Sequence, residues 1–313
     1  MEMKMTRATG QSSRKKGGKL LFLASIPFLL ATIIFSYVPL LGWSYAFFDY
    51  RAGFKLSDCE FVGFKHFASL FANEVLRDDL IRVLTNTFGI SLLSIATSFL
   101  PMFFAILLAE MRLKAYRKVV QTVTTIPNFI SWVLVYALAY AMFAVNDGVI
   151  NNILLKLHLI DTPINFLASP DHVWVKMWMY SMWKGLGWNA IIYVASISSI
   201  DAELYEAASI DGAGRGKQIL YITIPGLLPT FFVLLMLSVA NFLNTGVDQF
   251  FVFQNAMNKE SIEVLDLYVY NKGFVGTNIS FSTAVGMFKS LISLTLLFVI
   301  NFLSKCIRQE SIF

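Results

Sequence analysis

Residues 201–229 read DAELYEAASIDGAGRGKQILYITIPGLLP and separate two long apolar blocks of the chain. Asp201 is placed to cap the first amides of a short helix, and Glu203 in its first turn has the sign that the positive end of a helix dipole favours. Gly212 and Gly214 permit the left-handed turn that ends such a helix. The segment therefore predicts a short helix, a tight glycine turn and the start of an apolar helix.

The middle of this short helix is suited to contact with another protein. Ala207 and Ala208 leave a low surface that a partner can approach closely, while Leu204 and Tyr205 offer apolar anchors. On an ordinary helix-turn-helix connection, Glu206 would simply be a solvated acidic residue.

Six apolar segments are long enough to cross a bilayer, since about 30 Å of hydrocarbon needs roughly 20 mostly apolar residues. They lie near residues 20–45, 83–109, 119–144, 173–198, 227–253 and 282–304. Hydrophobic residues make up 57% of the 313 positions and charged residues 14%, whereas a soluble domain has roughly 25% charged residues. We expect an all-α, polytopic membrane protein with six transmembrane helices, in which residues 1–18 form a disordered cytoplasmic tail and residues 19–313 the membrane domain.

Positive residues indicate the orientation in the membrane. Lys and Arg are concentrated in the N-terminal tail, in 110–118, in 215–217 and at the C-terminus. Because positive residues are retained on the cytoplasmic side, both termini and the 201–229 segment are expected to be cytoplasmic. The outer connections would be 49–82, 146–172 and 254–281, folded into short helices that form either a packed lid or a docking surface.

Several catalytic and binding classes are disfavoured. The run Gly212–Gln218 is rich in glycine, but Gln218 stands where a phosphate-binding loop needs Ser or Thr. The histidines His66, His158 and His172 are far apart, so no metal site is expected. Positive residues lie beside apolar blocks rather than among aromatics, which argues against nucleic-acid binding. The chain is therefore not expected to be an enzyme or to hold a cofactor.

A few ionisable residues fall inside the predicted spans, where placing a charged side chain in the membrane costs free energy. Arg82 and Lys176 are near the outer ends of their spans, so their long side chains can extend to place the charged group in water. Lys184 is deeper and either lines a cavity or pairs with another helix, with Asp248 as the candidate partner. Such a pair would also suit a proton-driven secondary carrier, although the sequence shows no inverted repeat to support that class.

The 201–229 segment resembles the cytoplasmic signature loop of binding-protein-dependent ABC importer permeases. Glu206-Ala207-Ala208 is followed by Gly212 and then by Ile222, Ile224 and Pro225, with Ile224 in place of the family's Leu. The resemblance implies that this loop couples the chain to a separate ATPase, with Glu206 paired to a basic residue of that ATPase. The residues that it assigns to coupling are Glu206, Ala207, Ala208, Asp211, Gly212, Ala213 and Pro225.

Three more stretches resemble the maltose-type sugar permeases, in particular the branch that takes up polysaccharides and complex oligosaccharides. They are FSYVPLLGWSYAFFDY at 35–50, FVGFKHFASLF at 61–71 and YVYNKGFVGTNISFSTAVGMFKSLISLTLLFVINFLSK at 268–305. The resemblance implies a type I ABC importer permease fold in the bacterial cytoplasmic (inner) membrane. It also implies a second permease subunit as heterodimer partner, two copies of an ABC ATPase that carry the ATP and Mg, and an extracellular solute-binding protein that delivers an oligosaccharide.

In maltose-type relatives the sugar contacts fall on the spans before and after the signature loop. Trp183 and Gly185 fit the relatives' Trp-x-Gly, and Asn244 fits best on the following span. Aromatic faces and amides suit sugar rings and hydroxyls, whereas helix packing is the alternative role for the tryptophans. The predicted substrate-binding residues are Trp183, Lys184, Gly185, Trp188, Asn189, Asn241, Asn244 and Asp248. A permease of the same superfamily for a non-sugar solute is the main alternative.

Overall fold

The computed structural model describes residues 22–308, and this part of the chain is helical. Within residues 22–308 the extended pairing is limited to a single bridge between Phe48 and Phe61. The expected all-α class is therefore confirmed. The tail predicted to be disordered, residues 1–18, lies outside the described residues.

The first helix covers Phe22–Phe47, and its second half is wound as a π-helix and then a 3-10 helix. These two parts are η1 (Ile33–Tyr37) and η2 (Val38–Phe47). The elements up to the middle of the chain are η3 (Leu56–Asp58), α2 (Lys65–Ala72), α3 (Glu74–Ala96), α4 (Leu100–Ala109), α5 (Lys114–Thr125), η4 (Ile126–Phe129), α6 (Trp132–Phe143), α7 (Val149–Lys156) and α8 (Val173–Ser198). The remaining elements are α9 (Ala202–Ile210), α10 (Arg215–Gln218), η5 (Ile219–Thr223), α11 (Ile224–Ala240), α12 (Asp248–Phe253), α13 (Lys259–Ile262), α14 (Leu265–Tyr270), η6 (Asn271–Val275) and α15 (Ile279–Arg308).

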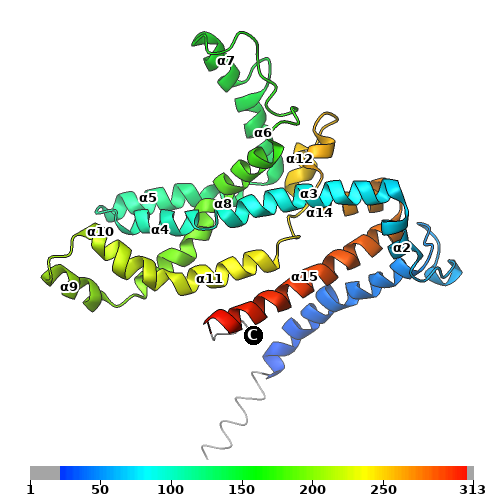
Figure 1. Cartoon of the computed structure of the whole chain (residues 1–313), viewed down its shortest axis with the longest axis horizontal. Helices are drawn as coiled ribbons and strands as arrows, with labels where there is room; N and C mark the ends of the chain where they lie inside the picture. Colours follow the sequence, from blue (N-terminus) through cyan, green and yellow to red (C-terminus); the bar gives the residue numbers. More distant parts are fainter. Residues whose placement is uncertain (1–21, 309–313) are drawn as a thin grey trace, which may run out of the picture.

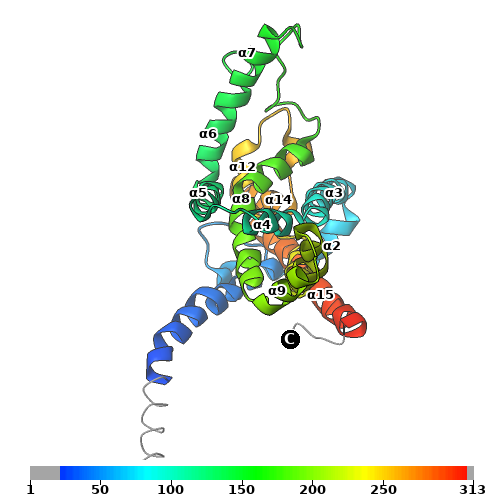
Figure 2. The ribbon, with the colours of Figure 1, turned by 90° about the vertical axis from the view of Figure 1, so that its left-hand side faces the viewer.

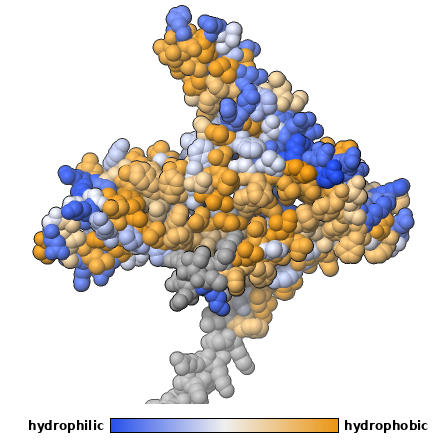
Figure 3. Space-filling model, in the orientation of Figure 1, coloured by the Kyte–Doolittle hydropathy of each residue, from blue (hydrophilic) through white to orange (hydrophobic). Residues whose placement is uncertain are grey.

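Four helical stretches in the described range are long and apolar enough to cross a membrane: Phe22–Phe47, Glu74–Ala109, Arg215–Ala240 and Ile279–Val299. A fifth is added if Lys114–Phe129 and Trp132–Phe143 are one broken span. The predicted segment 173–198 is the continuous helix α8, whose aromatic and polar residues leave it less apolar than the other four. Apolar residues cover most of the bundle surface in Figure 3, as a lipid-exposed chain requires.

Two predicted spans differ from the structure. The segment 119–144 is not one straight helix, because α5–η4 and α6 meet at 107°. Pro127 lies at this break, and Ser131 caps the start of α6 by accepting from Leu134 N. The segment predicted at 227–253 instead begins at Arg215 and ends at Ala240, after which residues 241–247 are not helical and α12 is a separate short helix.

Helix α8 forms the centre of the bundle and packs against α3, α4, α5 and α11. The second half of the first helix lies alongside α15 (Figure 1). Helices α6 and α7 project away from the bundle in both views (Figures 1 and 2). Helices α9 and α10 lie at one end of the molecule and α2 at the opposite end, as Figure 1 shows.

The break between α5 and α6 is held by Lys184 of α8. Its ammonium group donates to the carbonyl oxygens of Pro127, Asn128 and Ile130 at 3.2, 2.6 and 2.7 Å. It also lies 5.6 Å above the centre of the Trp132 ring. Lys184 therefore satisfies carbonyls that the break leaves without helical partners. The suggested pairing with Asp248 was wrong, because Asp248 is exposed at the start of α12 and forms no ion pair with Lys184.

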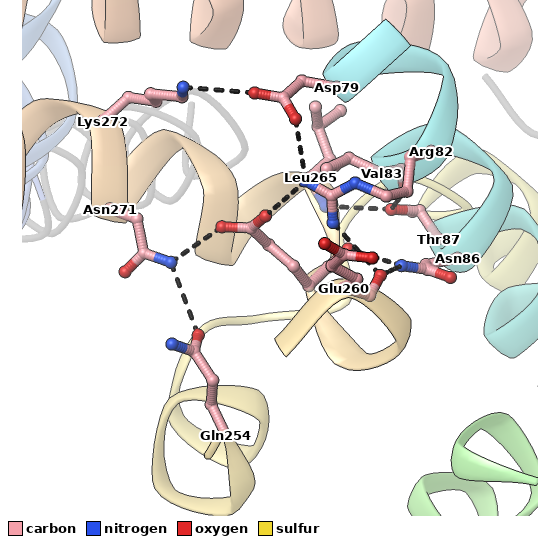
Figure 4. Close-up of polar contacts among 11 residues, drawn as sticks. Asp79, Arg82, Val83, Asn86, Thr87, Gln254, Glu260, Leu265, Asn271 and Lys272 are labelled. Carbon is pink, nitrogen blue, oxygen red and sulfur yellow. Dashed lines mark hydrogen bonds and ion pairs between the residues drawn. The ribbon is translucent and has the colours of Figure 1, made fainter. Parts of the chain in front are cut away.

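A polar network joins the first turns of α3 to the segment around α13 and α14 (Figure 4). Arg82 donates to Glu263 at 3.0 Å, to Asp79 at 3.1 Å and to the Glu260 carbonyl at 3.1 Å. The Glu263 side chain is only 5% exposed and also accepts from Asn271 at 2.8 Å. Arg82 is therefore bound within the protein, where the sequence had suggested that it reaches toward water.

The network continues through Asn86, one turn further along α3. Its amide donates to the carbonyls of Glu260 and Glu263 at 2.8 and 3.1 Å, and its oxygen accepts from Trp174 of α8 at 3.1 Å. Thr87 accepts from Leu265 N at 2.9 Å. Helix α3 thus supplies hydrogen-bond partners for the junction between α13 and α14, nearly 180 residues further along the chain.

Replacing Arg82 with Leu should lower the free energy of unfolding by about 3 kcal/mol, because Glu263 would remain buried without its cation. The measurement is thermal unfolding of the full chain in lipid nanodiscs. Arg77→Leu is the matched control, since Arg77 pairs with Asp78 on the exposed surface and should cost no more than about 0.5 kcal/mol. Equal losses in the two variants would contradict the role given to the Arg82 network.

Replacing Lys184 with Met should loosen the α5–α6 break, because three carbonyls lose a charged donor. We expect amide hydrogen exchange at residues 126–131 to become at least about tenfold faster, which corresponds to roughly 1.4 kcal/mol of lost protection. Lys118→Met, which removes an exposed lysine of α5, should leave this exchange unchanged. Unaltered protection in the Lys184 variant would show that the break is held by other contacts.

Candidate functional site

The predicted short helix of the 201–229 segment is present as α9, and its local signals act as expected. The Asp201 side chain accepts from Glu203 N at 3.0 Å and caps the helix. Gly212 has φ +75°, and the turn is closed by hydrogen bonds from Gly212 N to Ser209 O and from Ala213 N to Ala208 O. A residue with a Cβ is disfavoured at that φ, which explains the glycine.

Helix α9 is anchored to the bundle by a few specific contacts. The hydroxyls of Tyr205 and Thr223 share a hydrogen bond of 2.9 Å, and Thr223 is buried at the base of α11. Gln218 donates to the Ser209 hydroxyl at 2.9 Å. Gly226 lies so close to Ile200 that a Cβ there would approach the Ile200 side chain to 2.7 Å. The helix is therefore fixed to the start of α11 and the end of α8.

The rest of α9 is open to the outside of the molecule. Glu206 and Ala207 are exposed, as are Asp211 and Gly212, while Ala208 and Ala213 are half-buried. Glu206 has no hydrogen bond or ion pair with any described residue, and Leu204 and Ile210 are 53% and 86% exposed. Pro225 follows in the first turn of α11 and is also exposed. This surface carries two apolar side chains and an unpaired carboxylate, so it can bind a basic partner surface.

A cavity of about 420 Å³ lies between α3, α4, α8 and α11. Its size is within the range of small-molecule sites. The wall residues that carry a side-chain hydroxyl or amide are Ser94, Thr97, Ser98, Ser181, Asn189, Tyr193, Ser238 and Asn241. Trp178 also lines it and donates to the Thr97 hydroxyl at 2.8 Å. Hydroxyl and amide groups on an otherwise apolar wall can exchange hydrogen bonds with a polar solute.

The predicted substrate residues do not form one group. Gly185, Asn189 and Asn241 line this cavity. Lys184 lies on another side of α8, where it contacts the α5–α6 break, and Trp188 packs edge-on against Phe129 of η4.

Three further predicted residues, in addition to Lys184 and Trp188, lie outside the cavity wall. The Trp183 residue is 45% exposed. Asn244 donates to Asn241 at 3.1 Å in the segment after α11, and Asp248 is exposed in the first turn of α12. Helical rotation explains the division on α8, because residues four apart share a face and adjacent residues do not.

Sequence reasoning missed the α3–α4 side of the cavity. Ser94 lies in the last turn of α3, and Thr97 and Ser98 lie between the end of α3 and the start of α4. A signal was present, since three hydroxyl residues shortly before Pro101 interrupt an otherwise apolar block. Such a run indicates a break in the membrane helix. The backbone groups freed at the break, and the hydroxyls beside them, can face an internal cavity.

Comparison with known proteins places the chain in a family. Residues 101–309 match the model described as "Binding-protein-dependent transport system inner membrane component". Protein LplB of Bacillus subtilis (strain 168) is 37% identical over 95% of this chain and 92% of its own length. The permease protein YteP of the same organism, named for polygalacturonan/rhamnogalacturonan transport, is 36% identical over 94% of this chain and 90% of its own.

Solved structures agree with this result. A chain of a bacterial ABC transporter involved in import of the acidic polysaccharide alginate has 31% identity and a TM-score of 0.82, covering 95% of this chain and 99% of that one. The alginate transporter in complex with a periplasmic protein bound to alginate pentasaccharide gives a TM-score of 0.83. These matches confirm the expected importer permease fold and a transport subunit rather than an enzyme. The chain belongs to the family of binding-protein-dependent transport system inner membrane components.

Proposed function

We propose that this chain forms one half of the translocation pathway of an ATP-driven oligosaccharide importer. The support comes from its relatives, since one is named for polygalacturonan and rhamnogalacturonan transport and the similar solved structures come from an alginate importer. The polar wall of the cavity beside α8 is compatible with a carbohydrate. A permease of the same superfamily for a non-sugar solute is the alternative, since hydroxyl and amide groups can also bind other polar molecules.

The observation that carries the proposal is the exposed, unpaired surface of α9. If Glu206 had only a structural role within this chain, a hydrogen-bond donor or a cation beside it would be expected, yet its exposed side chain forms no hydrogen bond or ion pair with any described residue. We infer that α9 inserts into a cleft of a separate ABC ATPase, with Glu206 paired to a basic residue there and Gly212 setting the turn. Two ATPase copies, which carry the ATP and Mg, would drive a heterodimer of this chain with a second permease.

The proposed topology has six spans with both termini in the cytoplasm of a bacterial cell and α8 as the fourth span. Helix α8 connects the part of the molecule near α6 with α9, and α9 and α2 lie at opposite ends (Figure 1). In this arrangement α2, α7 and α14 lie outside, where a solute-binding protein would deliver the oligosaccharide.

Within the pathway we propose that Gly185, Asn189 and Asn241 contact the sugar directly, because they line the cavity. Trp183 is exposed enough to contact sugar where the two permeases meet. Lys184 and Trp188 act by fixing the break between α5 and α6. Asn244 and Asp248 would contribute only if the non-helical segment 241–247 and the start of α12 face the pathway.

Glu206→Gln should lower ATP-driven oligosaccharide uptake by more than about tenfold, because it removes a charge that pairs across an interface. Thermal stability should change by no more than about 0.5 kcal/mol, since the residue is exposed. The assay is uptake by the importer reconstituted with its partner subunits in proteoliposomes. Glu203→Gln on the same helix is the control, and normal uptake by the Glu206 variant would argue against coupling through α9.

In a chain with Cys59 and Cys306 replaced by Ser, the substitution Ile210→Cys should react with a membrane-impermeant maleimide only in inside-out vesicles. Leu157→Cys, at the end of α7, should react only in right-side-out vesicles. Both positions are highly exposed, so labelling reports the side of the membrane. The reverse pattern would overturn the proposed orientation.

A further inference from the structure

A second cavity lies outside the bundle core, where the projecting α6–α7 unit meets the turn after α12. Its volume is about 390 Å³. It is lined by Tyr136 and Tyr140 of α6, by Asn146 and Asp147 in the following turn, and by Asn165 and Asn255 from two other segments. Figure 3 shows hydrophilic residues beside the base of this projection. None of these residues belongs to the sites described above.

The polar groups of this cavity are largely without partners. The hydroxyls of Tyr136 and Tyr140 and the side chains of Asn146 and Asp147 form no hydrogen bond with any described residue. The Asn165 oxygen accepts from Ala168 N at 3.0 Å, which leaves its amide hydrogens free. The two tyrosine rings lie 6.4 Å apart, and Tyr140 is 58% exposed. Aromatic faces therefore lie beside several free donors and acceptors.

The walls of the cavity are held in place before any ligand arrives. Asn151 is fully buried and joins the end of α6 to the segment before α8. Its amide donates to Ala144 O at 3.0 Å and to Ile164 O at 2.9 Å, and its oxygen accepts from Ile164 N at 2.9 Å. Asn255 and Asn258 donate to Leu167 O at 3.2 and 3.3 Å. Ordering costs on binding are small when the lining is already fixed.

The lining points to the chemical class of the ligand. Tyrosine faces pack against the apolar faces of sugar rings, while amides, hydroxyls and a carboxylate satisfy sugar hydroxyls. Asp147 is the charged residue of the lining, which includes no Lys, Arg or His. A uronate would be repelled there, because like charges at short range disfavour each other.

We propose that this cavity binds one neutral sugar unit of a glycan before the glycan enters the membrane pathway. The inference rests on the proposed oligosaccharide function and adds an outer site that selects against acidic units. Tyr140 is the stacking platform, and Asp147 accepts hydrogen bonds from hydroxyl groups. The other polar side chains orient the ring.

The test is binding of maltotetraose, xylotetraose and tetragalacturonate to the full chain in lipid nanodiscs, followed by saturation-transfer NMR titration. At least one neutral probe should bind, and Tyr140→Ala should weaken it by about tenfold, the effect of losing about 1.4 kcal/mol. Asp147→Asn should raise the affinity for tetragalacturonate, a gain that unfolding cannot produce. Tyr116→Ala and Asp161→Asn are matched controls, because both residues are exposed and outside the cavity.

Several results would overturn the inference. One is neutral-sugar binding that neither variant alters, and another is stronger binding of tetragalacturonate than of neutral probes by the unmodified chain. If the variants weaken only the attachment of the solute-binding protein, the cavity is a protein docking surface instead. If no neutral probe binds, the outer site is absent, and ATP-driven oligosaccharide uptake by the same importer would then show that the proposed function still stands.

Discussion

The structure depends on one constraint: backbone groups freed where a helix breaks inside a lipid-exposed bundle must find partners within the protein. Polar side chains from neighbouring helices provide them. Lys184 donates to three carbonyls at the α5–α6 break, and Ser91 of α3 donates to Phe242 O at 2.6 Å where α11 ends. Asn86 does the same for the segment near α13. The broken helices are therefore parts of a connected framework.

This framework gives the two sides of α8 different roles. One side holds the bent α5–η4–α6 unit through Lys184 and Trp188, and the other lines the cavity with Gly185 and Asn189. A movement of α8 would therefore change the bend and the cavity together. Only three residues separate the C-terminal end of α8 from α9. A displacement of α9 would therefore move α8, and with it the α5–α6 bend and the cavity wall.

The molecule has contrasting ends. At the α9 end, apolar and charged side chains are exposed and the helix is attached by a few contacts around Tyr205 and Gly226. At the opposite end, Arg82 of α3 pairs with Glu263 at the end of α13, Leu265 N of α14 donates to Thr87 of α3, and Lys289 of α15 pairs with Asp266 of α14. Helix α14 is thus fixed to two long helices, while α9 presents a free surface. One end of the molecule therefore has an exposed helix, α9, and the other has a helix, α14, that is bonded to α3 and α15.

Much of the α9 surface could be predicted from the sequence, because its signals are local. The cap at Asp201, the turn at Gly212 and the small residues between them each depend only on residues within a few positions along the chain. All three features are present in the structure. The existence of the apolar helices was equally evident from length and composition. Three residues of the cavity lining, Gly185, Asn189 and Asn241, could be anticipated from the sequence, but not the wall formed by Ser94, Thr97 and Ser98.

The sequence by itself determined that this chain is helical, apolar on its outside and equipped with a short capped helix between two long apolar segments. Only the tertiary structure decided where helices break and which residues meet across the bundle. Arg82 and Glu263 are 181 residues apart, and Lys184 finds carbonyls rather than Asp248. The physical reason is that a helix signal depends on neighbours within one or two turns, whereas the partner of a buried charge depends on which helices pack together.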